Sequence, residues 1–324
     1  MKILIIGFGS MGKRRARLIS TVMPSALRYA VDMSPQRRNE AKELSIPTFE
    51  SIKEAVAAVQ PDAAFVCTSP LSHAKVINEL LDNNLPVFTE LNLVSDGYDE
   101  LVQKAKDKNL TLFLSNTMIY RAEPQYIINA VHSFEKPVNY IYHIGQYLPD
   151  WHPWEDYKSF FVGDKRTGGV REIFGIDLPW ILRAFGDVAS ISVEKDSISD
   201  LQLPYPDSCF VTLRHKNGTK GFMAADVVAP KAVLNFEVFG DGLHIFWEGN
   251  PKTLFRYNPE TKEKEFVNTY ASFEHDPRFS DNVVETAFAD EIQCFFDVLS
   301  GKATAKYSFE EDARALKVID EIDA

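Results

Sequence analysis

The chain opens with an apolar segment, Lys2 to Ile6, that runs directly into three glycines, Gly7, Gly9 and Gly12. A continuous β-branched run of this kind predicts a strand buried on both faces, as in a parallel sheet. The glycine spacing suits a turn from strand to helix: the first glycine allows the tight turn, the second lets a ligand approach the backbone, and the third lets the helix pack against the strand. This start therefore constrains the fold to an α/β domain with an anion-binding helix N-terminus.

A glycine pattern alone is weak evidence, because glycines also mark ordinary turns. Here an apolar pattern of helical spacing follows, and a second strand-like segment, Leu27 to Val31, ends at Asp32, 20 residues after Gly12. A carboxylate at that distance accepts hydrogen bonds from the ribose hydroxyls of a dinucleotide. We therefore predict an NAD site at this turn. Its expected contacts are Gly7, Gly9, Ser10, Met11, Gly12 and Asp32.

Two arginines, Arg37 and Arg38, leave NADP open as the alternative cofactor. Asp32 would repel the 2′-phosphate of NADP, whereas either arginine could neutralise it. We interpret both arginines as residues of a solvated helix face and therefore favour NAD. The basic residues of the first helix are likewise expected to be mostly solvated; they are Lys13, Arg14, Arg15 and Arg17.

At 324 residues the chain is long enough for two domains, each with its own core. Residues 1–120 carry 14 Lys and Arg against 13 Asp and Glu, and the remainder carries 21 against 33. This acidic balance without a basic stripe argues against a nucleic acid as partner. No apolar run reaches the roughly 18 residues of a membrane span, and we expect neither a span nor a signal peptide. The three cysteines match no zinc spacing, so we expect reduced thiols, no metal site and a cytoplasmic location.

Strands and helices alternate through the first 120 residues. Further strands are expected at Pro47 to Phe49, Asp62 to Thr68, Pro86 to Thr89 and Thr111 to Ser115. This alternation predicts a doubly wound parallel sheet, in which ligands bind at the carboxyl ends of the strands. Residues that follow those ends complete the expected cofactor site: Thr68, Ser69, His73, Glu90 and Asn116.

After residue 120 the pattern changes to that of an α+β domain. Strands are expected at Val138 to Leu148, Ser208 to His215, Thr219 to Val228, Leu234 to Phe239 and Leu243 to Trp247. Hairpin turn signals between them predict an open antiparallel sheet. Helices are expected at Arg171 to Phe185, Val283 to Leu299 and Phe309 to Ile322. We therefore expect an NAD-binding domain of residues 1–120 and a substrate and oligomerisation domain of residues 121–324, with the substrate in the cleft between them.

Several further motifs are similar to those of one known family. They are the glycine turn, Cys67-Thr-Ser-Pro-Leu-Ser-His73, Pro86-Val-Phe-Thr-Glu90, Asn116 followed by Arg121 and Pro124, Gly168-Gly169 before a helix, and Phe288-Ala-Asp-Glu-Ile-Gln293 followed by Ser300-Gly301. On these motifs the chain resembles the glucose-fructose oxidoreductase / inositol dehydrogenase / MocA (Gfo/Idh/MocA) family over nearly its whole length. The resemblance implies a Rossmann domain, an α+β domain, NAD(P)-dependent chemistry on a sugar, polyol or nucleotide sugar, and a homodimer or homotetramer joined through the open sheet.

One departure from that family follows the fifth strand. The family usually has Glu-Lys-Pro there, with the lysine between the nicotinamide and the reacting carbon, whereas this chain has Glu90-Leu91-Asn92. Leucine can neither move a proton nor donate to a hydroxyl. The family's lysine therefore has no equivalent at this position.

A second departure lies in the helix after Gly168-Gly169, where the family has an Asp and, four residues later, a His that acts as acid and base. Without gaps these positions hold Ile173 and Asp177, and a shift of one residue gives Glu172 and Ile176. Neither alignment recovers the histidine. We expect Asp177 to be the general base, with Glu172 as its alternative.

The segment Gln146 to Lys158, rich in aromatic and acidic residues, matches no family motif. Aromatic walls with a few polar groups suit a sugar ring, and His152 could replace the missing base, with Arg171 or Lys158 orienting the substrate. Alternatively, the tryptophans fix the loop to the sheet and His152 binds a carbonyl. The other histidines have no metal-binding spacing.

Three functions fit these residues. The first is an NAD-dependent dehydrogenase or reductase of a carbohydrate-like substrate, in which Asp177 or His152 handles the hydroxyl proton. The altered proton relay also suits an enzyme that retains NAD and isomerises, epimerises or cleaves a sugar. The third is an NAD-binding protein that has lost its chemistry.

Overall fold

The computed structural model, which describes residues 1–273, 275, 280 and 282–324, contains two compact units. Unit 1 comprises residues 1–116 and 288–313, and unit 2 comprises residues 117–287 and 314–324. The sequence predicts the boundary at residue 120 and assigns all later residues to the second domain. In the structure unit 1 ends at residue 116, and residues 288–313 return to it. Residues 288–313 join unit 1 because the ring of Phe295 packs edge-on against Phe65, Phe88 and Phe113 of its sheet.

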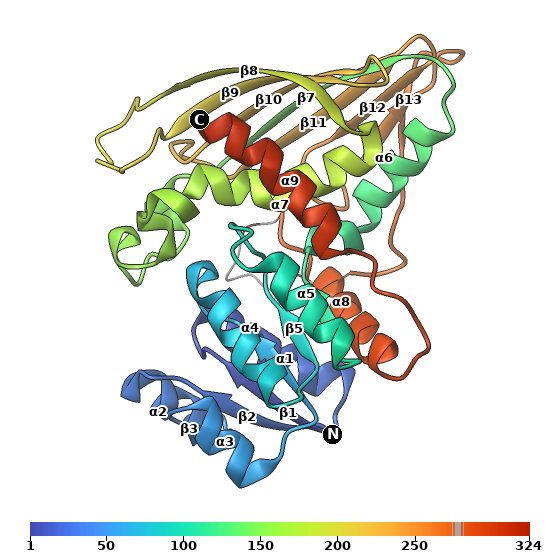
Figure 1. Cartoon of the computed structure of the whole chain (residues 1–324). Coiled ribbons are helices and arrows are strands. Elements are labelled where there is room, and N and C mark those ends of the chain that lie inside the picture. Colours follow the sequence, from blue (N-terminus) through green and yellow to red (C-terminus); the bar gives the residue numbers. More distant parts are fainter. Residues whose placement is uncertain (274, 276–279, 281) are drawn as a thin grey trace. The chain divides into compact units, whose positions relative to one another are not determined.

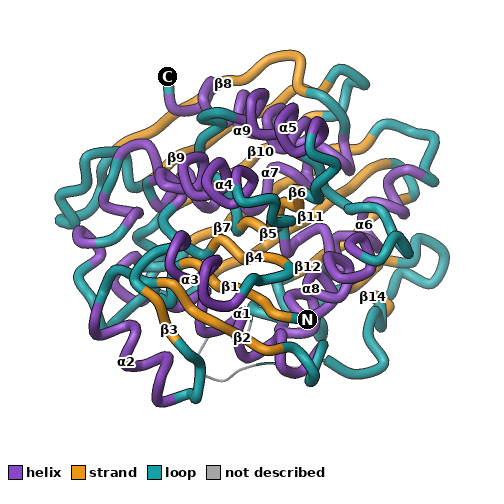
Figure 2. Tube along the Cα trace, turned by 60° about the horizontal axis from the view of Figure 1, so that its bottom comes forward, coloured by secondary structure: helices purple, strands orange, loops and turns teal. Residues whose placement is uncertain are grey.

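Unit 1 is built on a six-stranded sheet in which all pairs are parallel. Its strands are β1 (Lys2–Ile6), β2 (Leu27–Val31), β3 (Thr48–Phe49), β4 (Ala63–Val66), β5 (Val87–Thr89) and β6 (Leu112–Leu114). They lie in the order β3-β2-β1-β4-β5-β6, which Figure 2 shows. This is the order of a Rossmann fold, and the predicted doubly wound sheet is confirmed. The order reverses between β1 and β4, where such sheets bind their ligands.

Helices pack on both faces of this sheet, which is why β1 is apolar without alternation. They are α1 (Ser10–Val22), α2 (Pro35–Glu43), α3 (Ile52–Val59), α4 (His73–Asp82), α5 (Tyr98–Asp107) and most of α8 (Glu285–Leu299). Ile3, Leu4 and Ile5 of β1 are fully buried between them. The core therefore holds the strands in place and leaves their carboxyl ends to form the site.

Unit 2 is built on an eight-stranded sheet. Its strands are β7 (Val138–Gly145), β8 (Val188–Asp196), β9 (Ser208–His215), β10 (Lys220–Asp226), β11 (Val233–Gly240), β12 (Leu243–Trp247), β13 (Phe255–Tyr257) and β14 (Lys264–Phe266). Their order is β14-β13-β12-β11-β7-β10-β9-β8. The sheet is mixed, because β7 pairs in parallel with β10, so the prediction of an antiparallel sheet is wrong for this pair. Hairpin signals fix the pairs β9–β10 and β11–β12, but they do not say where β7 inserts.

Two helices of unit 2, α6 (Ala122–His132) and α7 (Gly169–Phe185), lie along one face of this sheet (Figure 1). Helix α9 (Phe309–Asp323) begins in unit 1 and ends in unit 2. Tyr140 and Tyr142 of β7 point to the helices, whereas Ile141 between them is 44% exposed. Within unit 2, no described helix covers the face that carries Ile141 (Figure 1). No described helix has both the length and the apolar composition needed to cross a membrane.

Candidate functional site

The glycine turn joins β1 to α1 with a geometry that side chains would prevent. Gly7 has a φ of +87°, and a Cβ atom there would lie 2.8 Å from the carbonyl oxygen of Cys67. A Cβ atom on Gly12 would lie 2.1 Å from the carbonyl oxygen of Gly7. Both positions therefore require glycine for the turn and for the close packing of helix on strand.

Gly9 has a different role, because a side chain at this position would cause no clash and would meet only the flexible end of Arg37. The nearest atoms to a Cβ atom at this position would be those of the Arg37 guanidinium, at 3.6 Å or more. Gly9 is the N-cap of α1 and provides no side-chain cap, so the amides of the first helical turn lack intrahelical partners. A diphosphate fits this place, since bare amides and the positive end of the helix dipole both favour an anion.

Asp32 follows β2 beside this turn and is oriented by two backbone amides. The amide of Phe8 donates to Oδ2 at 2.7 Å, and the amide of Ser34 donates to Oδ1 at 2.8 Å. An ionised carboxylate has about four lone-pair sites, so capacity remains for ribose hydroxyls. The geometry thus fits the adenosine ribose of NAD.

The two arginines of the next helix lie differently from each other. Arg38 donates to the carbonyl oxygens of Asp32 and Met33 and pairs with Glu50 at 2.5 Å. Our prediction that it is solvated is wrong, because it closes the turn after β2. Arg37 is half-exposed, and its Nη1 lies 3.9 Å from Oδ2 of Asp32.

The prediction of a solvated basic face on α1 is also wrong for Arg14 and Arg15, which are 9% and 0% exposed. Arg15 donates to both oxygens of Glu90, at 2.5 and 3.0 Å, and to Oε2 of Glu291 at 2.7 Å. Burial alone would lower the pKa of this guanidinium, but the two carboxylates raise it. Glu90 therefore joins β5 to α1, and its expected contact with the cofactor stays a prediction.

His73 connects the turns that follow β4 and β5. Its Nε2 lies 2.9 Å from the carbonyl oxygen of Thr68, and its Nδ1 lies 2.5 Å from Oδ1 of Asn92. Burial lowers the pKa of the imidazole, although these hydrogen bonds oppose the shift.

The expected cofactor residues share the carboxyl edge of one sheet. Gly7 to Gly12 follow β1, Asp32 follows β2, Thr68, Ser69 and His73 follow β4, Glu90 follows β5, and Asn116 follows β6.

The three expected acid-base residues lie in unit 2, and the structure distinguishes them by burial. Asp177 of α7 is 3% exposed, and its Oδ1 accepts from the hydroxyl of Tyr142 at 2.5 Å and from the indole of Trp180 at 2.9 Å. Burial raises the pKa of this carboxyl to about 6, while the two donors and Arg121 oppose the rise. The carboxylate joins α7 to β7 in the core, and its expected role as base stays a prediction.

Glu172 lies in the first turn of α7 and is only partly buried. Its Oε2 is nevertheless inaccessible and accepts no hydrogen bond from the described residues. Burial raises the pKa of this carboxyl to about 8. A carboxyl whose pKa lies near physiological pH, on a residue that is partly exposed, has the properties of a general acid and base.

His152 lies in the long loop between β7 and α7. Its ring is stacked between Trp154 and Phe160, with centroids 5.2 and 4.8 Å away, and its Nδ1 pairs with Glu155 at 2.7 Å. Trp154 is 64% exposed and offers its other face to solvent. The ring of His152 therefore supports the tryptophan, and its role as base stays a prediction.

The two cations expected to orient a substrate are also placed. Arg171 is buried and pairs with Asp320 and Asp323, at 2.6 and 2.5 Å, and so anchors the end of α9. Lys158 is exposed and lies over the ring of Tyr157. Arg171 thus has a structural partner on α9, whereas Lys158 remains at the surface of the loop.

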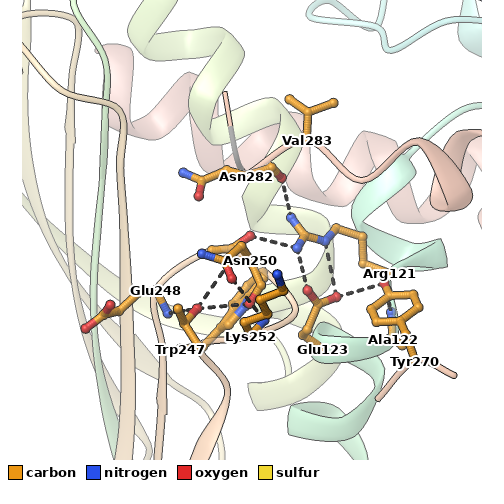
Figure 3. A network of polar contacts seen from close by, with 12 residues as sticks. Arg121, Ala122, Glu123, Trp247, Glu248, Asn250, Lys252, Tyr270, Asn282 and Val283 are labelled. Atoms are coloured by element: carbon orange, nitrogen blue, oxygen red, sulfur yellow. Dashed lines mark hydrogen bonds and ion pairs between the residues drawn. The ribbon is translucent and has the colours of Figure 1, made fainter. Parts of the chain in front are cut away.

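Arg121, one of the residues that carry the family resemblance, is the centre of a buried network at the start of α6 (Figure 3). It pairs with Glu123 at 2.5 Å and donates to the carbonyl oxygens of Gly249 and Asn282, each at 2.7 Å. The hydroxyl of Tyr270 donates to the same Glu123. This network ties three loops of unit 2 to α6, and the charge of Arg121 also acts on Asp177.

Sequence patterns alone did not reveal the buried partners Arg15, Asn92 and Glu291. A signal is present for the first, because Arg15 shares a helix face with Leu18 and Ile19 at spacings of three and four. Both of those apolar residues are buried, so a residue on their face is expected to be buried too. For Asn92 and Glu291, tertiary packing determines which residue they bind, and local sequence patterns do not encode that packing.

Comparison with known proteins gives a family for the first part of the chain. Residues 1–116 match the Gfo/Idh/MocA family, described as an oxidoreductase family with an NAD-binding Rossmann fold. That description confirms the NAD-binding Rossmann fold predicted from the glycine turn, and the choice of NAD over NADP stays a prediction. Among curated proteins, none matches the sequence.

Solved structures show the same fold over the whole chain. UDP-N-acetylglucosamine 3-dehydrogenase GnnA from Acidithiobacillus ferrooxidans is 17% identical with a TM-score of 0.77, covering 99% of this chain and 96% of its own. An oxidoreductase from Agrobacterium radiobacter in complex with NAD+, L-tartaric acid and magnesium is 14% identical with a TM-score of 0.79, covering 99% and 94%. An NAD-binding oxidoreductase from Klebsiella pneumoniae is 15% identical with a TM-score of 0.77, covering 99% and 95%. At these identities the likeness is one of fold.

Proposed function

Because residues 1–116 belong to the NAD-binding Rossmann family of oxidoreductases, we propose that the chain is an NAD-dependent oxidoreductase of a sugar, polyol or nucleotide sugar. The observation that carries the proposal is the uncrowded N-terminus of α1, where a Cβ atom on Gly9 would meet only the Arg37 guanidinium and no side chain caps the helix. The name of GnnA, which specifies a nucleotide sugar, supports the substrate class. So does the exposed Trp154, because an aromatic face can stack on a sugar ring.

In this proposal each group of the chain has one task. The first-turn amides of α1 bind the diphosphate, and Asp32 accepts from the ribose hydroxyls. NAD, when bound, supplies the hydride acceptor or donor. Glu172 takes the proton from a substrate hydroxyl during oxidation and returns it during reduction. We prefer Glu172 because the residue is partly exposed and its Oε2 accepts no hydrogen bond from the described residues. Asp177 is buried and accepts from two donors, and His152 is bonded to Glu155.

NAD rather than NADP is the proposed cofactor, because Asp32 would repel a 2′-phosphate and the half-exposed Arg37, 3.9 Å from its Oδ2, is a weak counter-charge. We also propose that the uncovered face of the second sheet pairs with a second copy of the chain. Ile141, Phe210 and Phe222 expose apolar surface at the centre of that face. Light scattering of the purified protein tests this, and a monomer at micromolar concentration would contradict it.

The test of function begins with calorimetric titration of NAD and NADP, followed by a screen of sugars, polyols and nucleotide sugars monitored by NADH absorbance. We expect tighter binding of NAD and net NADH formation with at least one substrate. Product formation without net NADH would indicate the alternative, an enzyme that keeps NAD bound and isomerises, epimerises or cleaves a sugar. Binding without any conversion would indicate a protein that has lost its chemistry, and no binding of either cofactor would refute the proposal.

A further inference from the structure

The turn after β5, Glu90-Leu91-Asn92, is held at both ends by buried polar contacts. We call these three residues the β5 turn. They lie at the carboxyl edge of the first sheet, beside the other expected cofactor residues. Asn92 is fixed by the imidazole of His73, and Glu90 is fixed by Arg15. Leu91, between them, is the partly exposed member of the turn.

Arg15, which binds Glu90, also binds Glu291, a residue far along the chain. Arg15 Nη2 lies 3.0 Å from Oε2 of Glu90 and 2.7 Å from Oε2 of Glu291, which belongs to α8. The hydroxyl of Ser115 donates to the same oxygen of Glu291 at 3.0 Å. A single guanidinium nitrogen thus donates to two carboxylates, Glu90 and Glu291, that lie far apart in the sequence.

The charges in this cluster do not balance when both carboxylates are ionised. Arg15 contributes one positive charge, Glu90 and Glu291 contribute two negative charges, and Glu291 is fully buried. Its Oε1 is also buried and accepts no hydrogen bond from the described residues. Burial and the charge of Glu90 raise the pKa of Glu291 to about 7, against the opposing effects of Arg15 and Ser115. Among the described residues, Cys67 is a further titratable group of this cluster, and its Sγ lies 3.8 Å from Oε1 of Glu90.

We propose that Glu291 is a positioning residue of the NAD site, which sets how firmly Arg15 holds the β5 turn. With Glu291 protonated, Glu90 has the guanidinium to itself and the turn is fixed. With Glu291 ionised, the second carboxylate competes for Arg15 and the Glu90 end of the turn loosens. The effect on NAD rests on the proposed function. Glu291 lies in the motif Phe288 to Gln293 and outside residues 1–116, which match the family.

Hydrogen exchange of the β5 turn tests, without any cofactor, whether ionisation of Glu291 loosens the turn. After correction for the intrinsic pH dependence of exchange, we expect amides 90–92 of the wild type to exchange severalfold faster at pH 8 than at pH 6. Glu291→Gln should remove this difference, because the amide mimics the protonated acid. Asp297→Asn, on the same helix but bonded to Gln293, is the matched control and should behave as the wild type. Equal pH dependence in wild type and Glu291→Gln would overturn the proposal.

A second variant covers the case in which Glu291→Gln does not fold. Ser115→Ala removes a donor to the ionised carboxylate of Glu291 and should therefore move the midpoint of the exchange transition to higher pH. An unchanged midpoint would contradict the assignment to Glu291. A midpoint that moves to lower pH would do so as well.

The affinity for NAD supplies the functional readout. We expect NAD to bind the wild type about fivefold more weakly at pH 8 than at pH 6, which is the lower end of ordinary coupling between sites. Calorimetry of Glu291→Gln should show no such change, and Asp297→Asn should show the full change. A wild-type slope that persists in Glu291→Gln would refute the positioning role. If NAD binds at neither pH, the proposed function fails, whereas the exchange experiment still decides the role of Glu291.

Discussion

Helices α1 and α7 both have a glycine as N-cap, Gly9 and Gly168, but the surroundings of these two glycines differ. At Gly9 a side chain would meet no atom nearer than 3.6 Å, and no side chain caps the helix. At Gly168 a Cβ atom would lie 2.6 Å from the ring of Tyr205, whose hydroxyl accepts from the amide of Gly169 at 2.9 Å. The start of α1 is left open for a ligand, whereas the start of α7 is filled by the protein itself.

This difference separates two ways of building a site. In the proposed function, binding at α1 depends on backbone amides near the glycines. The proposed chemistry at α7 depends on a side chain, Glu172, whose pKa is raised by burial in the first turn of the helix. Substitutions in the two places should therefore change different quantities, and the following experiments examine that separation.

The largest effect is expected from Glu172→Gln. Loss of a general acid and base should lower kcat roughly 10²- to 10⁴-fold, with NAD affinity unchanged. Because the pKa of Glu172 is raised to about 8, kcat/KM for oxidation should rise with pH to a midpoint near that value, and the variant should lack this limb. His152→Gln is the matched control and should keep most of its activity. If His152→Gln loses most of its activity and Glu172→Gln keeps it, the proton transfer belongs to His152 and the loop between β7 and α7.

A smaller effect is expected on the pH dependence of stability. Glu291 has a folded-state pKa of about 7, above its usual value, so its contribution is complete below the unfolded pKa and is lost as pH rises through 7. The decline should be on the order of 3 kcal/mol for this fully buried group. Urea titrations of unit 1 unfolding should show this decline in the wild type and in Asp297→Asn but not in Glu291→Gln. A decline of the same size in Glu291→Gln would assign it to another group.

The paired variants Gly9→Ala and Gly168→Ala test the comparison directly. Gly9→Ala should reduce NAD affinity at least about tenfold, close to 1.4 kcal/mol, and leave stability nearly unchanged. Gly168→Ala should destabilise the protein by roughly 1–3 kcal/mol through the clash with Tyr205, with little effect on NAD affinity. Calorimetry and thermal unfolding of both variants measure the two quantities. If the variants change the same quantity, the distinction between the two helix starts is lost.

The smallest effect is expected from Arg37→Ala. Arg37 is half-exposed and lies near Asp32, where it could pair with a 2′-phosphate. Its removal should weaken NADP binding by roughly threefold to fivefold, because an exposed ion pair contributes about 0–1 kcal/mol, and should leave NAD binding unchanged. A matching loss of NAD affinity would show that Arg37 contacts a group common to both cofactors.

The first sheet and its cofactor turn could be predicted because each requirement is local. Each of three features has a recognisable sequence pattern within about 30 residues: a strand buried on both faces, a glycine where φ is positive and a carboxylate after β2. The parallel insertion of β7 beside β10 has no such pattern, and neither does the burial of Arg15. That burial depends on Glu291, which lies 276 positions away. The acid-base residues were ambiguous for the same reason, since Glu172 and Asp177 differ in what surrounds them rather than in sequence pattern.

The return of residues 288–313 to unit 1 has a consequence for the synthesis of the protein. When the first 116 residues leave the ribosome, the rings of Phe65, Phe88 and Phe113 still lack Phe295, which covers them in the finished fold. Translation must reach Phe295 before that aromatic surface is closed. Until then the nascent protein carries an exposed apolar patch, which is the kind of surface that chaperones bind.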